Sequence, residues 1–405
     1  MELAQVIWII IQFIIGYNLV LPFLFFVIWK LFVQKQNSYK SDGNVQADYA
    51  IIVTAYEQTD NLSSVVSSIQ QLDYSNYMIY IVADKCDISN LNFDDQRVIL
   101  LRPAETIASN TGSHLYAVNH FIRNHDRITI IDSDNLVDAD YLNALNNYFD
   151  KGYKAVQGIR CAKNIDTTFS RLDAARDIYY HFYDGQILYE LGSSSTLSGS
   201  GMAFEINLYK EFLEKHNIKG AGFDKILQAF ILKKNLRIAF TDKAIVYDEK
   251  TSQSDQLVKQ RARWINTWFK YFNFGFSLIG KGIRNLSLNQ FLFGLVLLRP
   301  PLFIFILLSA MFLFINLLTL NFITVGIWII AMFLFVAGFM LALANSDTDS
   351  RIYKSLKDIP KFIFYQILSL LKSRNANKHS ISTKHYHNKD IEQLNSYRTH
   401  EDNTR

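Results

Sequence analysis

The chain has 405 residues, of which 50% are hydrophobic and 19% are charged, and its formal net charge is +4 at pH 7. This length can hold one large hydrophobic core with additional elements. The basic residues form no stripe interleaved with aromatic side chains, so no nucleic-acid partner is expected, whereas a small positive excess suits anionic membrane lipids as partners.

Two long apolar runs hold much of this hydrophobic content. Residues 6–29 are uncharged and long enough to cross a hydrocarbon layer of roughly 30 Å. A signal peptide is not expected here, because the run is too long and has neither a positive n-region nor a small-residue cleavage site. Residues 302–344 are also uncharged and long enough for two crossings joined near residues 319–324. The sequence therefore predicts three membrane spans.

Basic residues flank one side of each predicted span. They follow the first span, precede the second apolar run and recur after it: Lys30, Lys35, Lys40, Lys270, Lys281, Arg284, Arg299, Lys354, Lys357, Lys361, Lys372, Arg374 and Lys378. Because such residues collect on the cytoplasmic side, we expect a multi-pass protein of the inner or plasma membrane. Its N-terminus would lie outside, and its middle region and C-terminus in the cytoplasm.

The middle region alternates between short β-rich runs and runs with helical spacing. Strands are expected at 49–53, 78–83, 98–101 and 127–131, and helices at 62–72 and 115–122. This alternation predicts an α/β fold with a mostly parallel sheet that binds its ligands at the carboxyl ends of the strands.

The remaining apolar segments are shorter. Residues 359–371 are too few to span a membrane, and their spacing and flanking lysines favour an amphipathic helix lying in the interface. Residues 291–298 are similar, and Pro300 and Pro301 would break that helix before the next span. Ordinary packed helices are the alternative for both segments. The expected organisation is a membrane helix at 1–33, the α/β domain at 46–270, interfacial helices at 271–300, two membrane helices at 301–344, an interfacial amphipathic helix at 345–374 and a polar cytoplasmic tail at 375–405.

Carboxylates follow two of the expected strands directly. Asp84 ends the second strand, and Asp132 and Asp134 end the fourth in an Asp-x-Asp arrangement. Carboxylate oxygens are hard ligands suited to a divalent cation. Helix capping and turn formation are the structural alternatives for aspartate at such positions.

A fourth carboxylate, Asp224, follows a Gly-rich segment at 220–222 and opens a run with helical spacing at 225–232. A general base must be ionised and within hydrogen-bond reach of the hydroxyl that it deprotonates. Asp224 could meet that requirement, although a simple N-cap fits the local sequence equally well. Further along, Gln260, Arg263 and Trp264 form a Gln-x-x-Arg-Trp cluster. A guanidinium binds phosphate oxygens in a bidentate manner, and an indole offers a flat apolar face with one polar edge.

In order and spacing, these motifs resemble the inverting family 2 glycosyltransferases with the GT-A fold. The resemblance is to the membrane group containing cellulose, chitin, hyaluronan and poly-N-acetylglucosamine synthases. It covers about residues 49–268 and continues into the membrane region. The matching segments are the opening strand and nucleotide loop at 52–57, the second nucleotide motif at 82–86, Asp132-Ser133-Asp134, Phe223-Asp224, and Gln260, Arg263 and Trp264.

The chain departs from the family pattern in the opening loop and at the base position, and Cys86 stands where a small residue is common. Thr54 stands where proline is usual, and Glu57-Gln58 replaces the usual Asn-Glu. Phe223 precedes the base position where many members have a second carboxylate, so that site retains only Asp224.

The resemblance implies a role for each matching residue. Ala55, Tyr56, Glu57, Asp84 and Asp132 would bind the nucleotide-sugar donor, and Asp134 would bind Mg²⁺ or Mn²⁺. Asp224 would be the catalytic base. Gln260, Arg263 and Trp264 would contact the diphosphate and the acceptor. Direct displacement would invert the anomeric centre and yield a β-linked product from an α-linked donor.

The resulting hypothesis is a hexosyl- or N-acetylhexosaminyltransferase that extends a cell-surface, capsular or exopolysaccharide from a nucleotide-diphosphate sugar, with UDP-sugars expected first. Transfer of one sugar to a lipid-linked glycan is the alternative, and an inactive membrane scaffold with a sugar-binding fold is a further one. Because three spans provide few helices to wall a pore, a partner subunit or a homo-oligomer is expected. The sequence names neither the sugar nor the linkage.

Overall fold

One mixed sheet organises the domain expected at 46–270. The structure is a computed structural model that describes residues 3–33, 46–376 and 391–392. Within those residues, eight strands pair in the order β3-β2-β1-β4-β7-β6-β8-β5. Their bounds are β1 Tyr49–Tyr56, β2 Tyr77–Asp84, β3 Val98–Leu101, β4 Arg127–Asp132, β5 Leu136–Val137, β6 Ala155–Ala162, β7 Met202–Glu205 and β8 Ile238–Asp248.

The sheet is mostly parallel, as predicted. Strands β3, β2, β1 and β4 run parallel to one another, and β6 runs parallel to β8. Strand β7 is antiparallel to both β4 and β6, and β5 is antiparallel to β8. The four expected strands lie within β1 to β4, so the α/β fold class is confirmed.

Helices cover both faces of this sheet because its strands alternate their apolar side chains. Along β1, Ala50 and Ile52 face one hydrophobic cluster with α3, α7 and α8, whereas Ile51 and Val53 face a second cluster with α2 and α4. Successive strand residues point to opposite faces, which produces this two-sided core. The helices are α2 Leu62–Gln70, α3 Asn110–Asn119, α4 Tyr141–Phe149, α7 Ile206–Lys215 and α8 Phe223–Lys233.

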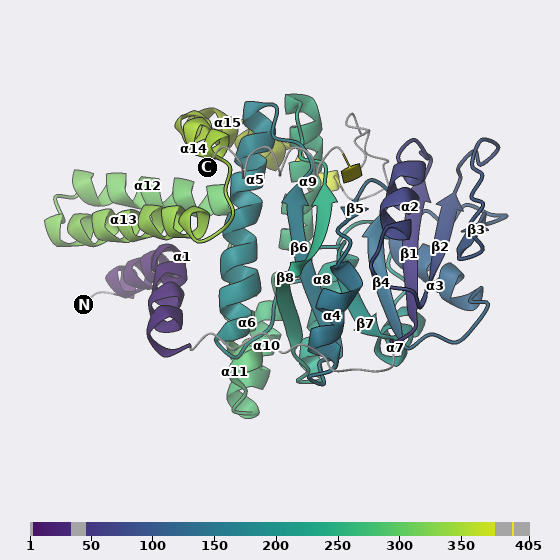
Figure 1. Ribbon diagram of the computed structural model, residues 1–405. Coiled ribbons are helices and arrows are strands. Elements are labelled where there is room, and N and C mark those ends of the chain that lie inside the picture. The colour runs from purple at the N-terminus through teal and green to yellow at the C-terminus, as the bar shows by residue number, and fades with distance from the viewer. Residues whose placement is uncertain (1–2, 34–45, 377–390, 393–405) are drawn as a thin grey trace.

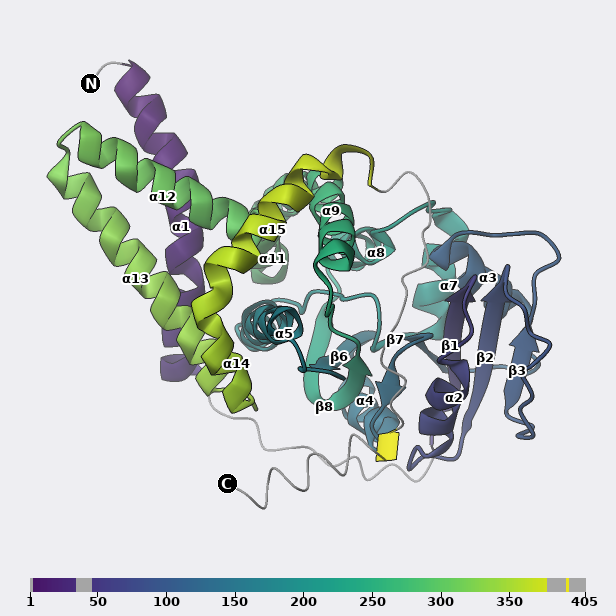
Figure 2. The ribbon, with the colours of Figure 1, turned by 90° about the horizontal axis from the view of Figure 1, so that it is seen from above.

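A long helical segment separates the sheet from the apolar helices (Figures 1 and 2). It comprises α5 (Thr168–Tyr180), a π-helical stretch at His181–Ile187 and the short α6 (Leu188–Glu190). Tyr183 donates a hydrogen bond of 2.8 Å to the carbonyl of Gly338, and the ring of Tyr179 stacks on Phe339 at 5.6 Å. This segment therefore packs against the apolar helix α13 (Phe322–Ala344).

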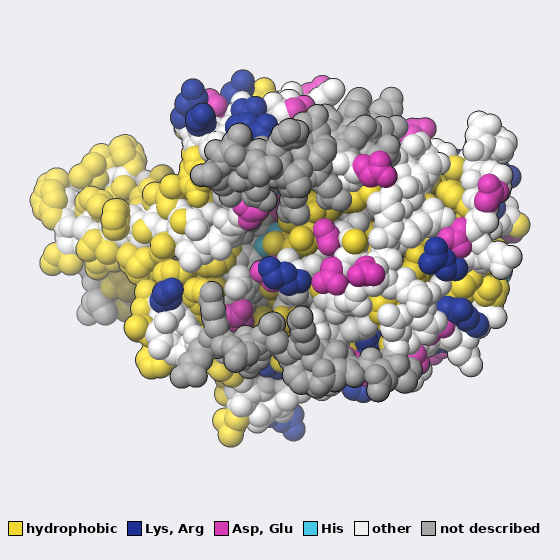
Figure 3. All heavy atoms as spheres, in the orientation of Figure 1, with side chains coloured by type: hydrophobic (Ala, Val, Ile, Leu, Met, Phe, Trp, Pro, Cys, Tyr) yellow, Lys and Arg dark blue, Asp and Glu magenta, His cyan; other side chains and the backbone are white. Residues whose placement is uncertain are grey.

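Three apolar helices extend away from the sheet, namely α1 Leu3–Phe32, α12 Leu302–Leu318 and α13 Phe322–Ala344. Figure 3 shows hydrophobic side chains covering the projecting part of the molecule. In the described residues, α1 and α13 are long and apolar enough to cross a membrane. A third crossing requires α12 to be combined with α11 (Leu288–Leu298), which meets it at a bend of 70°. That bend falls at Pro300 and Pro301, where the sequence predicts a break.

A buried polar contact ties these three helices together. The side-chain oxygen of Gln12 on α1 accepts hydrogen bonds from Asn316 on α12 at 2.6 Å and from Trp328 on α13 at 2.8 Å. Polar side chains commonly join helices in this way within membranes. The contact places the start of α1 beside the turn between α12 and α13, at the end far from the sheet (Figure 2).

The remaining helices are α9 Ser254–Tyr271, α10 Phe274–Arg284, α14 Ser350–Ser355 and α15 Ile359–Leu371. Helices α14 and α15 contact α5, α9 contacts α15, and α10 packs against α11 and α8. Phe362 on α15 packs with Leu257 on α9, whereas Phe364 and Leu371 are exposed. This two-sided character fits the amphipathic helix expected there, and its contact with lipid stays a prediction. Nearly all of the tail expected at 375–405 lies outside the described residues, and Ile391 is buried against the second core cluster.

Candidate active site

The strand-end residues predicted from the sequence meet at one edge of the sheet. In the parallel register, Tyr56 on β1 lies opposite Asp84 on β2, and Thr54 lies opposite Asp132 on β4. Parallel strands bring their carboxyl ends to the same edge, where α/β proteins bind ligands. The structure therefore brings the nucleotide loop and two of the predicted carboxylates together.

Asp84 has a structural partner at this edge. Its side chain is 2% exposed, and its two oxygens accept hydrogen bonds from the backbone amides of Ile107 at 3.0 Å and Ala108 at 2.7 Å. Asp84 thus fixes the loop that leads into α3. Direct contact between Asp84 and a nucleotide stays a prediction.

The loop after β1, which the sequence predicts to bind the nucleotide, turns sharply at Glu57, whose φ is +61°. The Glu57 amide donates to the carbonyl of Asp84 at 3.2 Å, and its carboxylate pairs with Lys85 at 2.7 Å. Ala55 is buried and Tyr56 half-buried. A backbone hydrogen bond and an ion pair therefore join the loops that follow β1 and β2.

Asp132 and Asp134 lie half-buried beside a loop of small residues at 197–201. The Asp132 amide donates to the hydroxyl of Ser200 at 3.1 Å, and the Gly201 amide donates to the carbonyl of Ile130 at 2.9 Å. The buried amide group of Gln157 holds the same loop through Ser198 and Ser200. This segment of small residues therefore packs directly against the Asp-x-Asp strand.

These carboxylates suit a divalent cation shared with a phosphate ligand. The described residues contain no group of three or more His, Cys, Asp or Glu side chains placed to hold a metal. Mg²⁺ is commonly bound through one or two carboxylates together with substrate phosphates. The two carboxylates of Asp132 and Asp134 have the chemistry that such a cation requires, and their binding of a metal stays a prediction.

Asp224 lies in the first turn of α8, close to α9. The preceding Gly222 has a φ of +96°, and a Cβ atom there would meet Thr267 at 2.6 Å and Tyr271 at 2.8 Å, both on α9. Only glycine allows this approach at low conformational cost. The Asp224 carboxylate pairs with Lys225 at 3.3 Å, and Lys225 also donates to the carbonyl of Leu197 at 3.2 Å. The predicted base is therefore fixed between α9 and the small-residue loop.

The predicted Gln-x-x-Arg-Trp cluster lies on α9. The side-chain oxygen of Gln260 accepts a hydrogen bond of 2.8 Å from Thr251. Arg263 is half-buried, and burial lowers the pKa of its guanidinium. Trp264 is 36% exposed. Of these three side chains, Trp264 offers the most surface to a ligand.

A buried ion cluster below α9 was not anticipated from the sequence. Its ion pairs join β6, α5, the end of β8 and α9, and its members are Arg160, Asp173, Arg176, Asp177, Asp248, Lys250 and Arg261. The one available signal was the i, i+3, i+4 spacing of Asp173, Arg176 and Asp177, which places them on one helix face.

The charges of this cluster shift several pKa values. Burial alone would lower the pKa of Arg160, but Asp248 and Asp177 outweigh it and raise that pKa. Asp132 acts on Arg160 in the same direction, so the cluster adjoins the Asp-x-Asp strand. Burial and the neighbouring Arg176 guanidinium lower the pKa of Arg261 to about 10. All four cationic side chains therefore remain charged at neutral pH, beside the candidate site.

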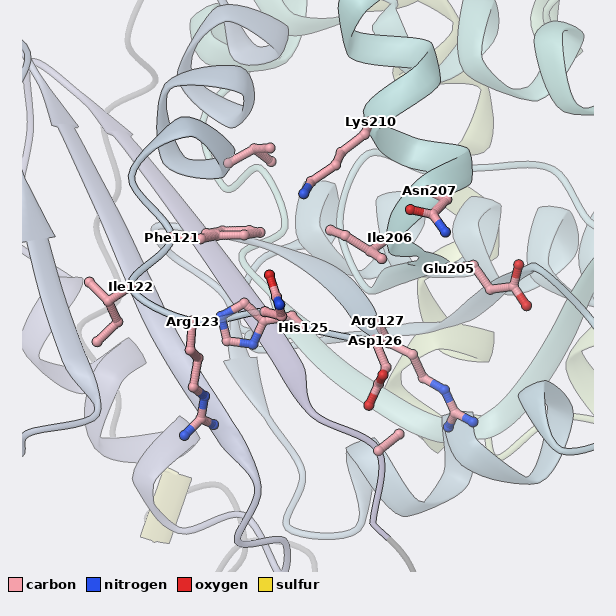
Figure 4. Close-up of a pocket in the computed structure, with 13 residues that line it drawn as sticks. Phe121, Ile122, Arg123, His125, Asp126, Arg127, Glu205, Ile206, Asn207 and Lys210 are labelled. Atoms are coloured by element: carbon pink, nitrogen blue, oxygen red, sulfur yellow. The ribbon is translucent and has the colours of Figure 1, made fainter.

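A separate concavity of about 1010 Å³ lies at the opposite edge of the sheet. It is lined by residues at the starts of β1 and β4 and by α7. Figure 4 shows Lys210 and Ile206 of α7 near Phe121, with Arg123 and Arg127 on either side of Asp126. Since ligands of open α/β sheets bind at the carboxyl ends of the strands, this concavity is distinct from the candidate active site.

Comparisons with known proteins identify a matching family and structures of similar fold. The family model of glycosyltransferase-like family 2 matches residues 46–267. No curated protein matches the chain significantly in sequence. Among solved structures, a mannosyltransferase from Pyrobaculum calidifontis in complex with GDP-Man and Mn²⁺ is similar, with 13% identity and a TM-score of 0.51 over 92% of this chain and 99% of that one. TarS 1-349 of S. aureus gives 14% identity and a TM-score of 0.37 over 82% of this chain and 90% of that one.

Proposed function

Because the chain belongs to glycosyltransferase-like family 2, we propose that it is a membrane-embedded inverting transferase that extends a polysaccharide from a nucleotide-sugar donor. The principal support is a series of contacts at the carboxyl ends of the strands. Asp132 ends β4 and bonds the loop at 197–201, Lys225 beside Asp224 bonds the same loop, and Gly222 at the start of α8 packs against α9, which carries Trp264. A donor, its metal and an acceptor need to meet in one place.

Each side chain then has a defined task. Asp134 would hold Mg²⁺ or Mn²⁺, with Asp132 beside it on the nucleotide side. When bound, the cation neutralises the diphosphate leaving group. Arg263 adds positive charge to that group, and Asp224 removes the proton from the acceptor hydroxyl as it attacks the anomeric carbon. The small-residue loop at 197–201 lets the sugar approach the backbone closely.

The arrangement of helices supports a cytoplasmic site. The start of α1 lies beside the turn between α12 and α13 through Gln12, Asn316 and Trp328, and the other ends of these helices lie toward the sheet (Figure 2). With three spans, the proposed topology has the N-terminus outside and the catalytic domain inside the inner or plasma membrane, as the flanking basic residues predict. Nucleotide sugars are then available to the site.

The number of apolar helices favours a second candidate function. The described residues contain two helices of membrane-spanning length, or three if the bent pair forms one span. Three helices cannot by themselves enclose a channel for a growing polymer. A transferase that adds one hexose or N-acetylhexosamine to a lipid-linked acceptor needs no channel, whereas polymer export needs a partner subunit or a homo-oligomer.

Replacement of Asp224 tests the proposed chemistry. Asp224→Asn should lower transfer by about 10²- to 10⁴-fold, the usual contribution of general base catalysis, and leave donor affinity nearly unchanged. Glu211→Gln, which removes a surface carboxylate on α7 paired with Lys215 and Lys234, is the matched control. If donor affinity falls as much as transfer, Asp224 is a structural cap. If the wild type neither transfers sugar nor hydrolyses any donor, the chain is a scaffold.

A further inference from the structure

Two guanidinium groups lie against the exposed indole of Trp264. The guanidinium carbon of Arg261 lies 4.1 Å from the ring centroid of Trp264, and that of Arg176 lies 4.6 Å from it. Arg261 belongs to the same helix, α9, whereas Arg176 comes from α5. A cation over an aromatic face attracts the ring and restricts its tilt. The orientation of Trp264 therefore depends on a residue far from its motif in sequence.

Both guanidiniums are anchored by a single carboxylate. Asp173 on α5 pairs with Arg176 at 3.1 Å and also with Arg261. Arg176 pairs in addition with Asp177, so it is held from two sides. The side chains of Asp173 and Arg261 are 4% and 3% exposed. Buried ion pairs with several hydrogen bonds have little freedom to rearrange, which makes this group a rigid support.

We propose that Arg176 is a positioning residue for Trp264, and that Asp173 fixes Arg176 for that task. The inference rests on the proposed function, in which Trp264 contacts the acceptor sugar. Arg176 itself need not touch the acceptor. It keeps the indole in the orientation that a pyranose can stack on, so its loss weakens acceptor binding and leaves the donor step unchanged.

Kinetics of variants separates positioning from general stability. Arg176→Gln should raise the KM for a β-linked N-acetylglucosamine or glucose pentamer by about 3- to 30-fold, equivalent to about 0.7–2 kcal/mol. Its kcat and its rate of donor hydrolysis should change less than twofold. Arg176→Lys keeps the charge and should recover part of the affinity. Arg171→Gln is the control, since Arg171 lies on the same helix and bonds the carbonyls of Ile165 and Asp166.

A double-mutant cycle tests whether Arg176 acts through Trp264. If it does, Arg176→Gln should not raise the acceptor KM further in a Trp264→Ala background. An equal rise in both backgrounds overturns the proposal, because Arg176 would then act on the acceptor independently.

A spectroscopic readout makes the proposal testable without activity. The protein is labelled with 5-fluorotryptophan, and the ¹⁹F signal of Trp264 is assigned as the one missing from Trp264→Phe. Arg176→Gln and Arg176→Lys should shift this signal, and Arg171→Gln should not. If the wild type transfers no sugar, the proposed function fails and the ¹⁹F comparison alone decides the positioning role. A Trp264 signal that is unchanged in both Arg176 variants refutes the positioning role of Arg176. If Arg176→Gln does not fold, the signal of Arg176→Lys alone decides the test.

Discussion

Substitution of Gly222 by alanine tests how α8 and α9 bring the predicted base to the acceptor side. Gly222 combines a φ of +96° with contacts to α9 that leave no room for a Cβ atom, which would lie 2.6 Å from Thr267 and 2.8 Å from Tyr271. Real Cβ atoms do not approach carbon this closely, so the Thr267 and Tyr271 side chains or the two helices must shift in the variant. We expect α8 to move away from α9 and to carry Asp224, two residues further on, with it.

The cost has two parts. A left-handed backbone costs an L-residue about 1–2 kcal/mol, and overpacking costs about 1–3 kcal/mol more. Gly222→Ala should therefore destabilise the fold by about 2–5 kcal/mol. A displacement of the base by about 1 Å can lower the transfer rate by about 10²-fold. Both effects are measurable on protein in detergent, by chemical unfolding and by sugar transfer.

Gly152→Ala is the matched control for backbone strain. Gly152 has a φ of +86° and no heavy atom within 4 Å of an added Cβ. Its substitution should therefore cost only the about 1–2 kcal/mol of the left-handed backbone and leave sugar transfer unchanged. If Gly222→Ala behaves like Gly152→Ala in both stability and rate, the close packing of α8 on α9 has no role in placing Asp224.

Three further predictions concern the metal, acid stability and topology. Asp134→Asn should keep the fold but remove most metal-dependent turnover, and an undiminished wild-type rate in excess EDTA would contradict the metal role. Burial lowers the pKa of His114 to about 3, whereas the unfolded value is about 6.5. Between these two pH values only the unfolded chain binds the proton. The contribution of His114 to stability is therefore present above pH 6.5 and is lost toward pH 3 at about 1.4 kcal/mol per pH unit. His114→Gln should flatten the pH dependence of the free energy of unfolding, and an unchanged slope would exclude this contribution. Cysteine labelling in intact cells should modify a probe near Glu2 and spare one near Asn388, whereas the reverse pattern would place the site outside.

Much of the fold was predictable because strand and membrane signals are local. Short β-rich runs predict β1 to β4, and the observed strands match these runs or extend them by at most a few residues. Helix α3 begins at Asn110, earlier than the expected 115, because Ser109 caps it by accepting a hydrogen bond from Gly112. A cap depends on one side chain and on none of the apolar periodicity used to predict the helix.

The candidate site was only partly predictable, because its support comes from distant contacts. The sequence identified the strand-end carboxylates and the α9 motif from their spacing. It gave no reason for Asp173 and Arg176 to lie below Trp264, since α5 and α9 are separated by more than seventy residues. From the sequence, Asp224 could be either a catalytic base or a helix cap. The close packing of Gly222 against α9 is what distinguishes the surroundings of Asp224 from those of an ordinary helix start.

Product analysis tests the central proposal most directly. Membranes containing the wild-type protein are supplied in turn with UDP-sugars and GDP-sugars, and the product is examined by gel for length and by NMR for anomeric configuration. We predict that one α-linked donor gives a β-linked polymer and that Asp224→Asn gives none. A product with a single added sugar would favour the second candidate function. An α-linked product would contradict the inverting mechanism itself.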